Sequence, residues 1–294
     1  MKRLLLTFAV IMSAVLTSNA EETTKTYSFE DITKIEVGFL YEVYVTPGNS
    51  DKVKVVYDSE YEKHLRVKYK GHESKLELQL NDIPNKFKRG GHQPSIQVYL
   101  EMSDIEEIIV MGAGKIFFDG AFKAKDLNIG MSSAAKLSLQ NIHGRDMTFS
   151  CSGACNADIS GCFQKVDADI SGAAKCNLSI EADIFNGELS GAAKLAAVMR
   201  SFCKLCEIEC SGAAKLELKG IGGRLDIEGS GACDIDTHYF EAEISEVELS
   251  GASKAKVYAN KTLMYNVSRA SKMIHYGNAA LVNMNVDDNV VKGD

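Results

Sequence analysis

Eight cysteines are the side chains of this sequence best suited to chemistry, and all of them follow residue 150. Cys203 and Cys206 have the C-x-x-C spacing of redox and metal sites. No second pair and no nearby histidine completes a zinc set, so we predict no metal and no cofactor. Cys151 and Cys210 hold equivalent positions three repeats apart, about 14 Å at strand spacing, and a disulfide needs Cα atoms within about 7 Å. We therefore expect most of the cysteines to be buried, unpaired and structural.

The other reactive side chains form no catalytic set. The six histidines are scattered, without the H-x-x-x-H or H-E-x-x-H spacing of a metal site. No G-x-S-x-G elbow, P-loop or dinucleotide motif occurs. Acidic residues recur at a fixed spacing, and no break in the repeats brings several Asp, Arg or Lys residues together without a periodic reason. The sequence therefore predicts no catalytic residues, and we expect a protein that is not an enzyme.

Lysines recur at one position of a repeat of about twenty residues, and Lys175, Lys194 and Lys215 stand in three successive copies. Acidic residues stand two positions before the start of five successive repeats, as at Glu188 and Glu209, and we expect this neighbouring column to offset the mutual repulsion of the lysines. The pattern fits a solvated, charge-balanced face that prevents lateral aggregation. The alternative is a regular array for an acidic glycan or a surface partner.

A second group of candidate contacts lies in residues 81–94, which are basic and contain Gly and Pro. This composition predicts an exposed loop. Phe87, Lys88 and Arg89 are its candidate contact residues, and an ordinary mobile loop is the alternative.

These side chains are positioned by a repeated Ser-Gly-Ala triplet, which starts at Ser152, Ser171, Ser190, Ser211, Ser230 and Ser250. Apolar residues alternate on both sides of each triplet, which is typical of strands with one buried face. Stacked units of strand, corner and strand predict an all-β fold, a right-handed parallel β-helix (β-solenoid) with coils of about twenty residues and Ser-Gly-Ala corners. We expect the triplet's alanine at the inner edge of the corner, where little space remains, and its glycine at positive φ.

The chain is expected to have four parts. Lys2 and Arg3 precede a short apolar stretch, and Ser18-Asn19-Ala20 fits a cleavage site, so the start is predicted to be a signal peptide. The predicted parts are a signal peptide (1–20), irregular β coils or a cap of the same solenoid (21–104), regular β-helix repeats (105–275), and a C-terminal cap and tail (276–294).

The charge and hydropathy of the sequence limit the classes of partner that we expect. The formal net charge of −7 offers no electrostatic basis for binding nucleic acid. The leading apolar stretch is shorter than the roughly 20 residues that span a bilayer, so no direct membrane span is expected. We predict an exported protein of the periplasm, the outer-membrane surface or the extracellular space, with self-association as one option.

The N-terminal segments add a resemblance to a known family. Phe29-Glu30-Asp31-Ile32 leads into Ile35-Glu36-Val37-Gly38-Phe39, and Ile96-Gln97-Val98-Tyr99-Leu100 follows later. With Ile105-Glu106-Glu107-Ile108 and the Ser-Gly-Ala coils, the chain resembles the auto-transporter adhesin head domain family, also called the GIN domain or DUF2807. The resemblance implies an exported right-handed parallel β-helix, without an accepted catalytic set and with a role in adhesion at the cell envelope.

Three functional hypotheses follow. The leading one is a non-enzymatic binding or adhesion module of the cell envelope that contacts a glycan or a surface protein. The second is a polysaccharide lyase or hydrolase on the same fold, which rests on fold analogy alone. The third is an envelope scaffold that assembles with itself.

Overall fold

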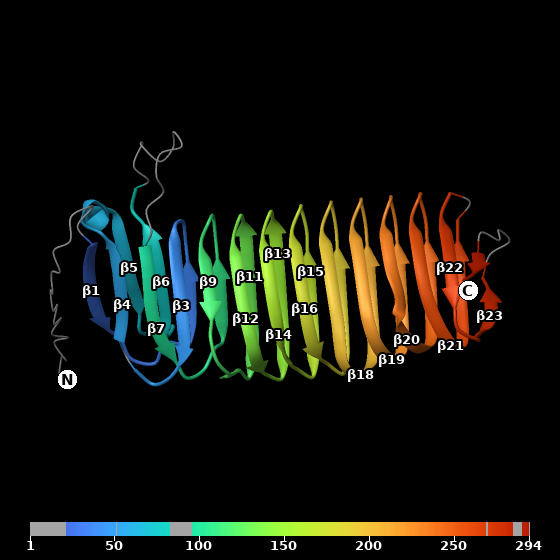
Figure 1. The fold of residues 1–294 in the computed structure, drawn as a ribbon, viewed down its shortest axis with the longest axis horizontal. Coiled ribbons are helices and arrows are strands. Elements are labelled where there is room, and N and C mark those ends of the chain that lie inside the picture. Colours follow the sequence, from blue (N-terminus) through green and yellow to red (C-terminus); the bar gives the residue numbers. More distant parts are fainter. Residues whose placement is uncertain (1–21, 51, 83–95, 269, 285–289, 294) are drawn as a thin grey trace.

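The computed structural model describes residues 22–50, 52–82, 96–268, 270–284 and 290–293. They form a β-solenoid of about 9 turns, with parallel strands about 20 residues apart in sequence (Figure 1). The predicted β-helix fold is therefore confirmed. The predicted signal peptide (1–20) lies outside the described residues.

The N-terminal end of the solenoid differs from the rest because several of its strands are antiparallel. Its elements are β1 (Glu22–Ser28), β2 (Lys34–Val37), β3 (Tyr41–Pro47), β4 (Lys52–Asp58), the 3₁₀ helix η1 (Ser59–His64), β5 (Leu65–Lys70), β6 (Lys75–Leu80) and β7 (Ile96–Met102). Strand β4 pairs antiparallel with β1 and β7, and β5 pairs antiparallel with β6. Strands β2 and β3 join this end to the regular coils, because they pair in parallel with β8 and β9.

Each regular coil places one strand before a corner and one after it. The strands before the corner are β8 (Glu107–Val110), β11 (Asp126–Ser133), β13 (Asp146–Gly153), β15 (Lys165–Ile170) and β17 (Ile184–Leu189). The strands after it are β9 (Lys115–Phe118), β12 (Lys136–His143), β14 (Asn156–Cys162), β16 (Lys175–Glu181) and β22 (Lys272–Tyr276). Four long strands belong to both groups, because each one follows a corner with its first half and precedes the next corner with its last half. They are β18 (Lys194–Cys210), β19 (Lys215–Gly229), β20 (Asp234–Leu249) and β21 (Lys254–Val267). We call the two stacks the pre-corner wall and the post-corner wall. They extend at the N-terminal end through β2 and β3.

Three short strands complete the fold. They are β10 (Phe122–Lys123), β23 (Ala280–Asn283) and β24 (Val290–Lys292). Strand β23 continues the pre-corner wall beside β21, and β24 continues the post-corner wall beside β22.

The core is a set of columns that run along the solenoid axis. Parallel register places Cys151, Ile170, Leu189 and Cys210 in successive coils of one inward column, and all four are buried. Most strands of the two walls alternate buried and more exposed residues, and this two-residue period buries one face of each wall. The apolar positions that alternate in the sequence are therefore the buried positions of the core.

The corners place their small residues differently from the prediction. Ala173 and Ala192, the third residues of two triplets, are exposed, whereas the next residues, Ala174 and Ala193, have 0% exposure. The backbone N–H of Ala192 donates to the carbonyl oxygen of Gly172 in the preceding coil at 2.7 Å. The triplet is thus the apex itself, with its backbone hydrogen bonds along the axis and its alanine side chain toward solvent. The expectation that this alanine lies inside was wrong.

The inner edge of the corner belongs to the residue that follows the triplet. This position is buried and small in successive coils: Ala135, Cys155, Ala174, Ala193, Ala214, Cys233, Ser253 and Ser271. The space restriction predicted for the corner therefore applies one residue later in the chain.

All eight cysteines are free thiols, and all except Cys162 are buried. The burial predicted for most of them is confirmed. Burial raises the pKa of Cys203 to about 11 and the pKa of Cys210 to about 12. These thiols therefore stay protonated in the folded chain at pH values where an unfolded chain would release their protons.

This difference predicts a loss of stability in alkaline solution. Between the unfolded thiol pKa of about 9 and the folded value of about 12, the folded state binds one more proton at Cys210, so the free energy of unfolding falls as pH rises. The protonated Cys210 thiol makes its full contribution to stability below pH 9. Between the two pKa values, the free energy of unfolding falls by up to about 1.4 kcal/mol for each pH unit. Urea denaturation at a series of pH values should show a shallower alkaline decline for Cys210→Ala than for the wild type. Equal slopes in the two proteins would contradict the assignment.

Candidate functional site

The predicted lysines form a column on the outer face of the post-corner wall. Lys175, Lys194 and Lys215 are the first residues of β16, β18 and β19, and parallel register makes them direct neighbours. All three are exposed. Each follows the buried residue at the inner edge of the corner, so the strand alternation directs it outward. The lysine column continues over the coils from β9 to β22 with Lys115, Lys136, Lys254 and Lys272, and Asn156 and Asp234 interrupt it.

An open groove of about 360 Å³ follows the central part of this column. Its lining includes Lys175, Lys194, Lys215, Asn177, Glu217, Asp234, Asp236 and Lys256. Lys215 Nζ lies 3.8 Å from a carboxylate oxygen of Asp234, but both side chains are more than half exposed, so water screens this pair. Within the described ranges, no carboxylate lies within ion-pair distance of Lys175 or Lys194. Lys175 and Lys194 thus present to the groove two ammonium groups without a fixed counter-charge among the described residues.

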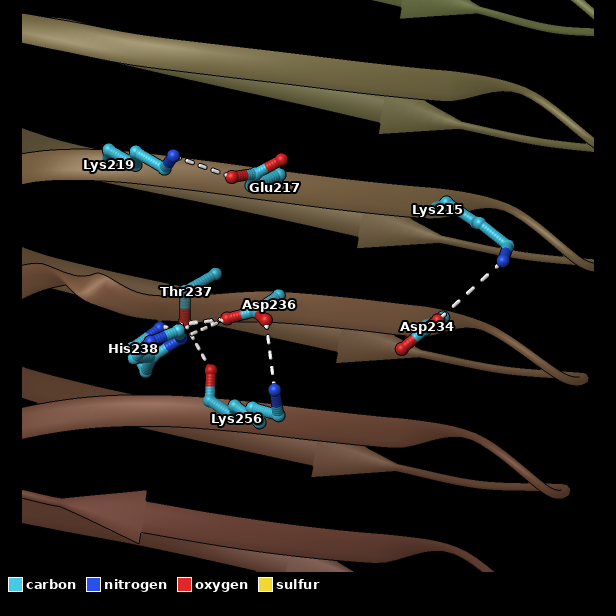
Figure 2. Close-up of polar contacts among 8 residues, drawn as sticks. All are labelled: Lys215, Glu217, Lys219, Asp234, Asp236, Thr237, His238 and Lys256. Atoms are coloured by element: carbon cyan, nitrogen blue, oxygen red, sulfur yellow. Dashed lines mark hydrogen bonds and ion pairs between the residues drawn. The ribbon is translucent and has the colours of Figure 1, made fainter. Parts of the chain in front are cut away.

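A polar network lies at the C-terminal side of the groove. Figure 2 shows Asp236 between His238 and Lys256, with Oδ1 facing the histidine Nδ1 and Oδ2 accepting from Lys256 Nζ at 3.2 Å. Burial opposes ionisation of Asp236, but these two hydrogen bonds lower its pKa, so it remains a carboxylate. The buried Thr237 donates to the backbone oxygen of Lys256 at 3.0 Å and anchors the strand beneath. The network can offer a ligand a fixed carboxylate, an ammonium and an imidazole.

This network lies where the repeat is irregular. Asp236 pairs with Glu217, but Lys219 pairs with Tyr239, so β20 has one more residue than β19 between these two pairs. The bulge leaves Tyr239 62% exposed, with its ring centroid 3.6 Å from that of His238. These residues belong to no motif or repeat position that was predicted to form a site. The available signal was the spacing of the triplets, which is 19 residues from Ser211 to Ser230 and 20 from Ser230 to Ser250.

The predicted acid column is on the other wall. Asp169, Glu188, Glu209, Glu228 and Glu248 are register neighbours on the outer face of the pre-corner wall. In the described parts of the chain, the ion pairs of the lysine column run to Glu42 and Asp234 and to none of these five acids. The corner separates the two columns because their residues project from different walls. The prediction that the acids offset the lysines by neighbouring them was wrong.

The acids instead gather around two open grooves of their own, of about 340 and 460 Å³. The larger groove is lined by Glu188, Glu207, Glu209, Asp226, Glu228, Glu246 and Glu248, together with Arg224. Arg224 donates to Asp226 at 2.8 Å and to Glu246 at 2.5 Å. The sequence predicted no convergence of acids without a periodic reason, and this convergence is periodic because the coil repeat itself stacks the acids.

The remaining predicted sites are placed as follows. Cys203 and Cys206 are both buried, and Cys203 Sγ donates to the backbone oxygen of Leu205 at 3.2 Å. In the part of the chain that the structure describes, no group of three His, Cys, Asp or Glu residues is arranged to hold a metal ion. Phe87, Lys88 and Arg89 lie outside the described residues, so their contact role stays a prediction. No helix among the described residues is long and apolar enough to cross a membrane.

The family model described as "Putative auto-transporter adhesin, head GIN domain" (DUF2807) matches residues 31–197 and 174–279. The chain belongs to the GIN-domain family. The predicted resemblance is therefore confirmed. Membership supports a surface protein of the binding type, and the family name describes an adhesin rather than an enzyme. No curated protein matches the chain.

Solved structures are similar to this GIN-domain chain to different degrees. A crystal structure from Parabacteroides distasonis ATCC 8503, described as a putative adhesin, matches 93% of this chain and 97% of its own, with 14% identity and a TM-score of 0.53. A putative adhesin from Parabacteroides merdae ATCC 43184 matches 93% and 94%, with 12% identity and a TM-score of 0.45. A structure from P. distasonis described as a putative lipid binding protein matches 92% and 94%, with 12% identity and a TM-score of 0.41. At these identities the first likeness shows the fold alone, and the other two support no further argument.

Proposed function

We propose that this protein is a non-enzymatic, exported binding module of the cell envelope that holds an acidic glycan along the lysine column. The observation that carries the proposal is the groove over Lys175, Lys194 and Lys215, where exposed ammonium groups stand in register without a fixed counter-charge on Lys175 and Lys194. Their spacing equals the strand spacing of about 4.8 Å. An extended polyanion laid along the solenoid axis can therefore meet one lysine in each coil.

The hydrolase form of the enzyme alternative would use the acid grooves of the pre-corner wall, where most carboxyl groups gather. Glycoside hydrolysis needs two carboxyl groups in different environments, so that one is protonated while the other is ionised. Glu188, Glu209 and Glu228 occupy equivalent positions of successive coils, and the repeat gives them similar surroundings. This equivalence favours a binding function over hydrolysis. Self-assembly into a scaffold remains the third hypothesis.

The binding proposal predicts a defined loss of affinity. The triple variant Lys175→Gln/Lys194→Gln/Lys215→Gln should bind polygalacturonate at least about tenfold more weakly. Each exposed charge contributes roughly 0.5 kcal/mol of binding free energy, and the three together amount to about a tenfold change in affinity. Wild-type affinity should fall as salt is raised, and neutral dextran should not bind. Isothermal titration calorimetry at low ionic strength measures these differences.

A matched control variant removes three lysine charges at positions outside the lysine column. Lys204 and Lys261 are exposed and paired with Asp183 and Glu243, and Lys123 lies on β10. Their triple replacement by glutamine should leave polygalacturonate affinity within about twofold of the wild type. Equal losses in both triple variants would mean that net charge, and not the column, drives binding. Absence of binding by the wild type would reject the proposal.

A further inference from the structure

Three aromatic rings stack on the outer face of the post-corner wall near its N-terminal end. Tyr99 on β7, Tyr44 on β3 and Phe117 on β9 are register partners, and Figure 1 shows these strands one after another along the axis. The ring centroids of Tyr44 and Tyr99 are 5.2 Å apart with planes at 14°, and those of Tyr44 and Phe117 are 5.5 Å apart with planes at 21°. We call this group the aromatic stack. The aromatic stack was not predicted, although Tyr44 and Tyr99 stand at outward positions of strands with alternating apolar residues.

Lysines cover both ends of the aromatic stack. Lys54 Nζ lies 5.7 Å from the ring centroid of Tyr99, and Lys136 Nζ lies 5.6 Å from that of Phe117. These are cation–π distances, so the outermost ring faces already have partners. What faces solvent is the row of ring edges, and Tyr99 is 40% exposed. Ring edges are apolar C–H surface with a partial positive charge.

The tyrosine hydroxyls leave acceptor oxygens at this surface. Tyr99 donates its hydroxyl proton to Gln97 Oε1 at 2.8 Å, and Tyr44 donates to Glu42 Oε1. Both protons are therefore used within the protein, and the hydroxyl oxygens can accept hydrogen bonds from a ligand. Lys115 Nζ lies 3.3 Å from the other oxygen of Glu42, so one ammonium of the lysine column borders the aromatic stack.

We propose that the aromatic stack, with Lys115 and Lys136, is a subsite for one sugar ring that carries a carboxylate. This inference rests on the proposed function and names the sugar-recognising end of the same face. A uronic acid offers ring and hydroxyl oxygens for the positively polarised ring edges, hydroxyl donors for the tyrosine oxygens, and a carboxylate for the lysines. A polypeptide anion such as polyglutamate offers the charge without the sugar ring and its hydroxyls. The subsite therefore distinguishes an acidic sugar from an acid of equal charge.

The chain contains no tryptophan, which allows a clean optical test. The variant Phe117→Trp carries the sole indole of the protein, placed in the aromatic stack. Titration with trigalacturonate should shift its emission in a saturable way. The matched reporter Tyr239→Trp, on the C-terminal part of the same wall, should not respond to the trimer. A response at position 239 without one at position 117 would overturn the proposed subsite.

Two sets of variants separate the subsite from the lysine column. Tyr99→Leu/Phe117→Leu keeps apolar bulk but removes two rings, and we expect about five- to tenfold weaker binding of trigalacturonate with polyglutamate binding unchanged. The Lys175/Lys194/Lys215 triple variant should weaken polygalacturonate and polyglutamate but not the trimer. Thermal unfolding midpoints equal to the wild type within a few degrees establish that each variant is folded, and the single Tyr99→Leu variant serves if the double variant is not.

The outcomes distinguish the two proposals. If the wild type binds neither polygalacturonate nor its trimer, the proposed function and the subsite are both rejected. If the wild type binds both, and removal of the rings leaves trimer affinity unchanged, the subsite alone is rejected. Loss of polyglutamate binding in the ring variant would also reject it, because the effect would then concern charge and not sugar recognition.

Discussion

Replacing Ala193 with leucine should lower the free energy of unfolding by about 1–3 kcal/mol, whereas the same change at Ala192 should leave it nearly unchanged. Ala193 has 0% exposure at the inner edge of a corner, with Ala174 and Ala214 in the same position of the adjacent coils. Three extra carbons there must displace packed neighbours. Ala192 is exposed at the apex, where a larger side chain meets solvent.

The pair of variants is a direct comparison, since the two alanines are adjacent and receive the same substitution. Urea denaturation followed by far-UV circular dichroism measures both. A larger loss for Ala192→Leu than for Ala193→Leu would mean that the triplet's alanine faces inward after all, and that the corner described here is shifted by one residue.

The second large effect is expected at the glycine of the triplet. Gly172 has φ +74°, and a Cβ at this position would lie 2.8 Å from the carbonyl oxygen of Gly153 and 2.9 Å from its nitrogen. Gly172→Ala should therefore lower the free energy of unfolding by about 2–4 kcal/mol, from left-handed backbone strain and from contact with backbone that cannot move aside easily. The carbonyl oxygen of Gly153 also accepts from Ala173 N–H at 2.7 Å, so displacing it would disturb the hydrogen-bond column of the corners.

Gly130 provides the matched control. It lies in β11, and the nearest atoms to an added Cβ, in Ile109 and Ser150, are 4.0 Å away. Gly130→Ala should be neutral or slightly stabilising, because alanine restricts the unfolded chain without a steric penalty in the folded one. Thermal denaturation of both variants tests the contrast. Similar losses at Gly130 and Gly172 would show that the corner has no special backbone requirement.

Much of the fold could be predicted from the sequence because the solenoid is built from local, repeated information. The alternation around each triplet predicted the buried columns that contain Cys151 and Leu189, and the recurring triplet predicted the corners. The direction of the alanine could not be predicted, because Ala192 and Ala193 are both small and follow each other. Only the course of the backbone through the apex distinguishes them.

The candidate site was predicted in part. Lys175, Lys194 and Lys215 were recognisable because residues at equal repeat positions become neighbours in a parallel stack. The aromatic stack was not, because Tyr44 and Tyr99 are brought together by β3 and β7, which are separated in the chain by antiparallel strands. The Asp236 network also escaped prediction, since no repeat position marks it and the extra residue of β20 lies between Asp236 and Tyr239.

The sequence by itself determined the class of fold, the coil length, the corner glycines and the lysine column, because each depends on a period that can be counted along the chain. The tertiary structure decided which wall each charged column occupies, which of two adjacent alanines lies inside, and which aromatic rings meet. These features depend on the direction of the chain at a corner and on pairing between distant strands. A one-dimensional period carries neither kind of information.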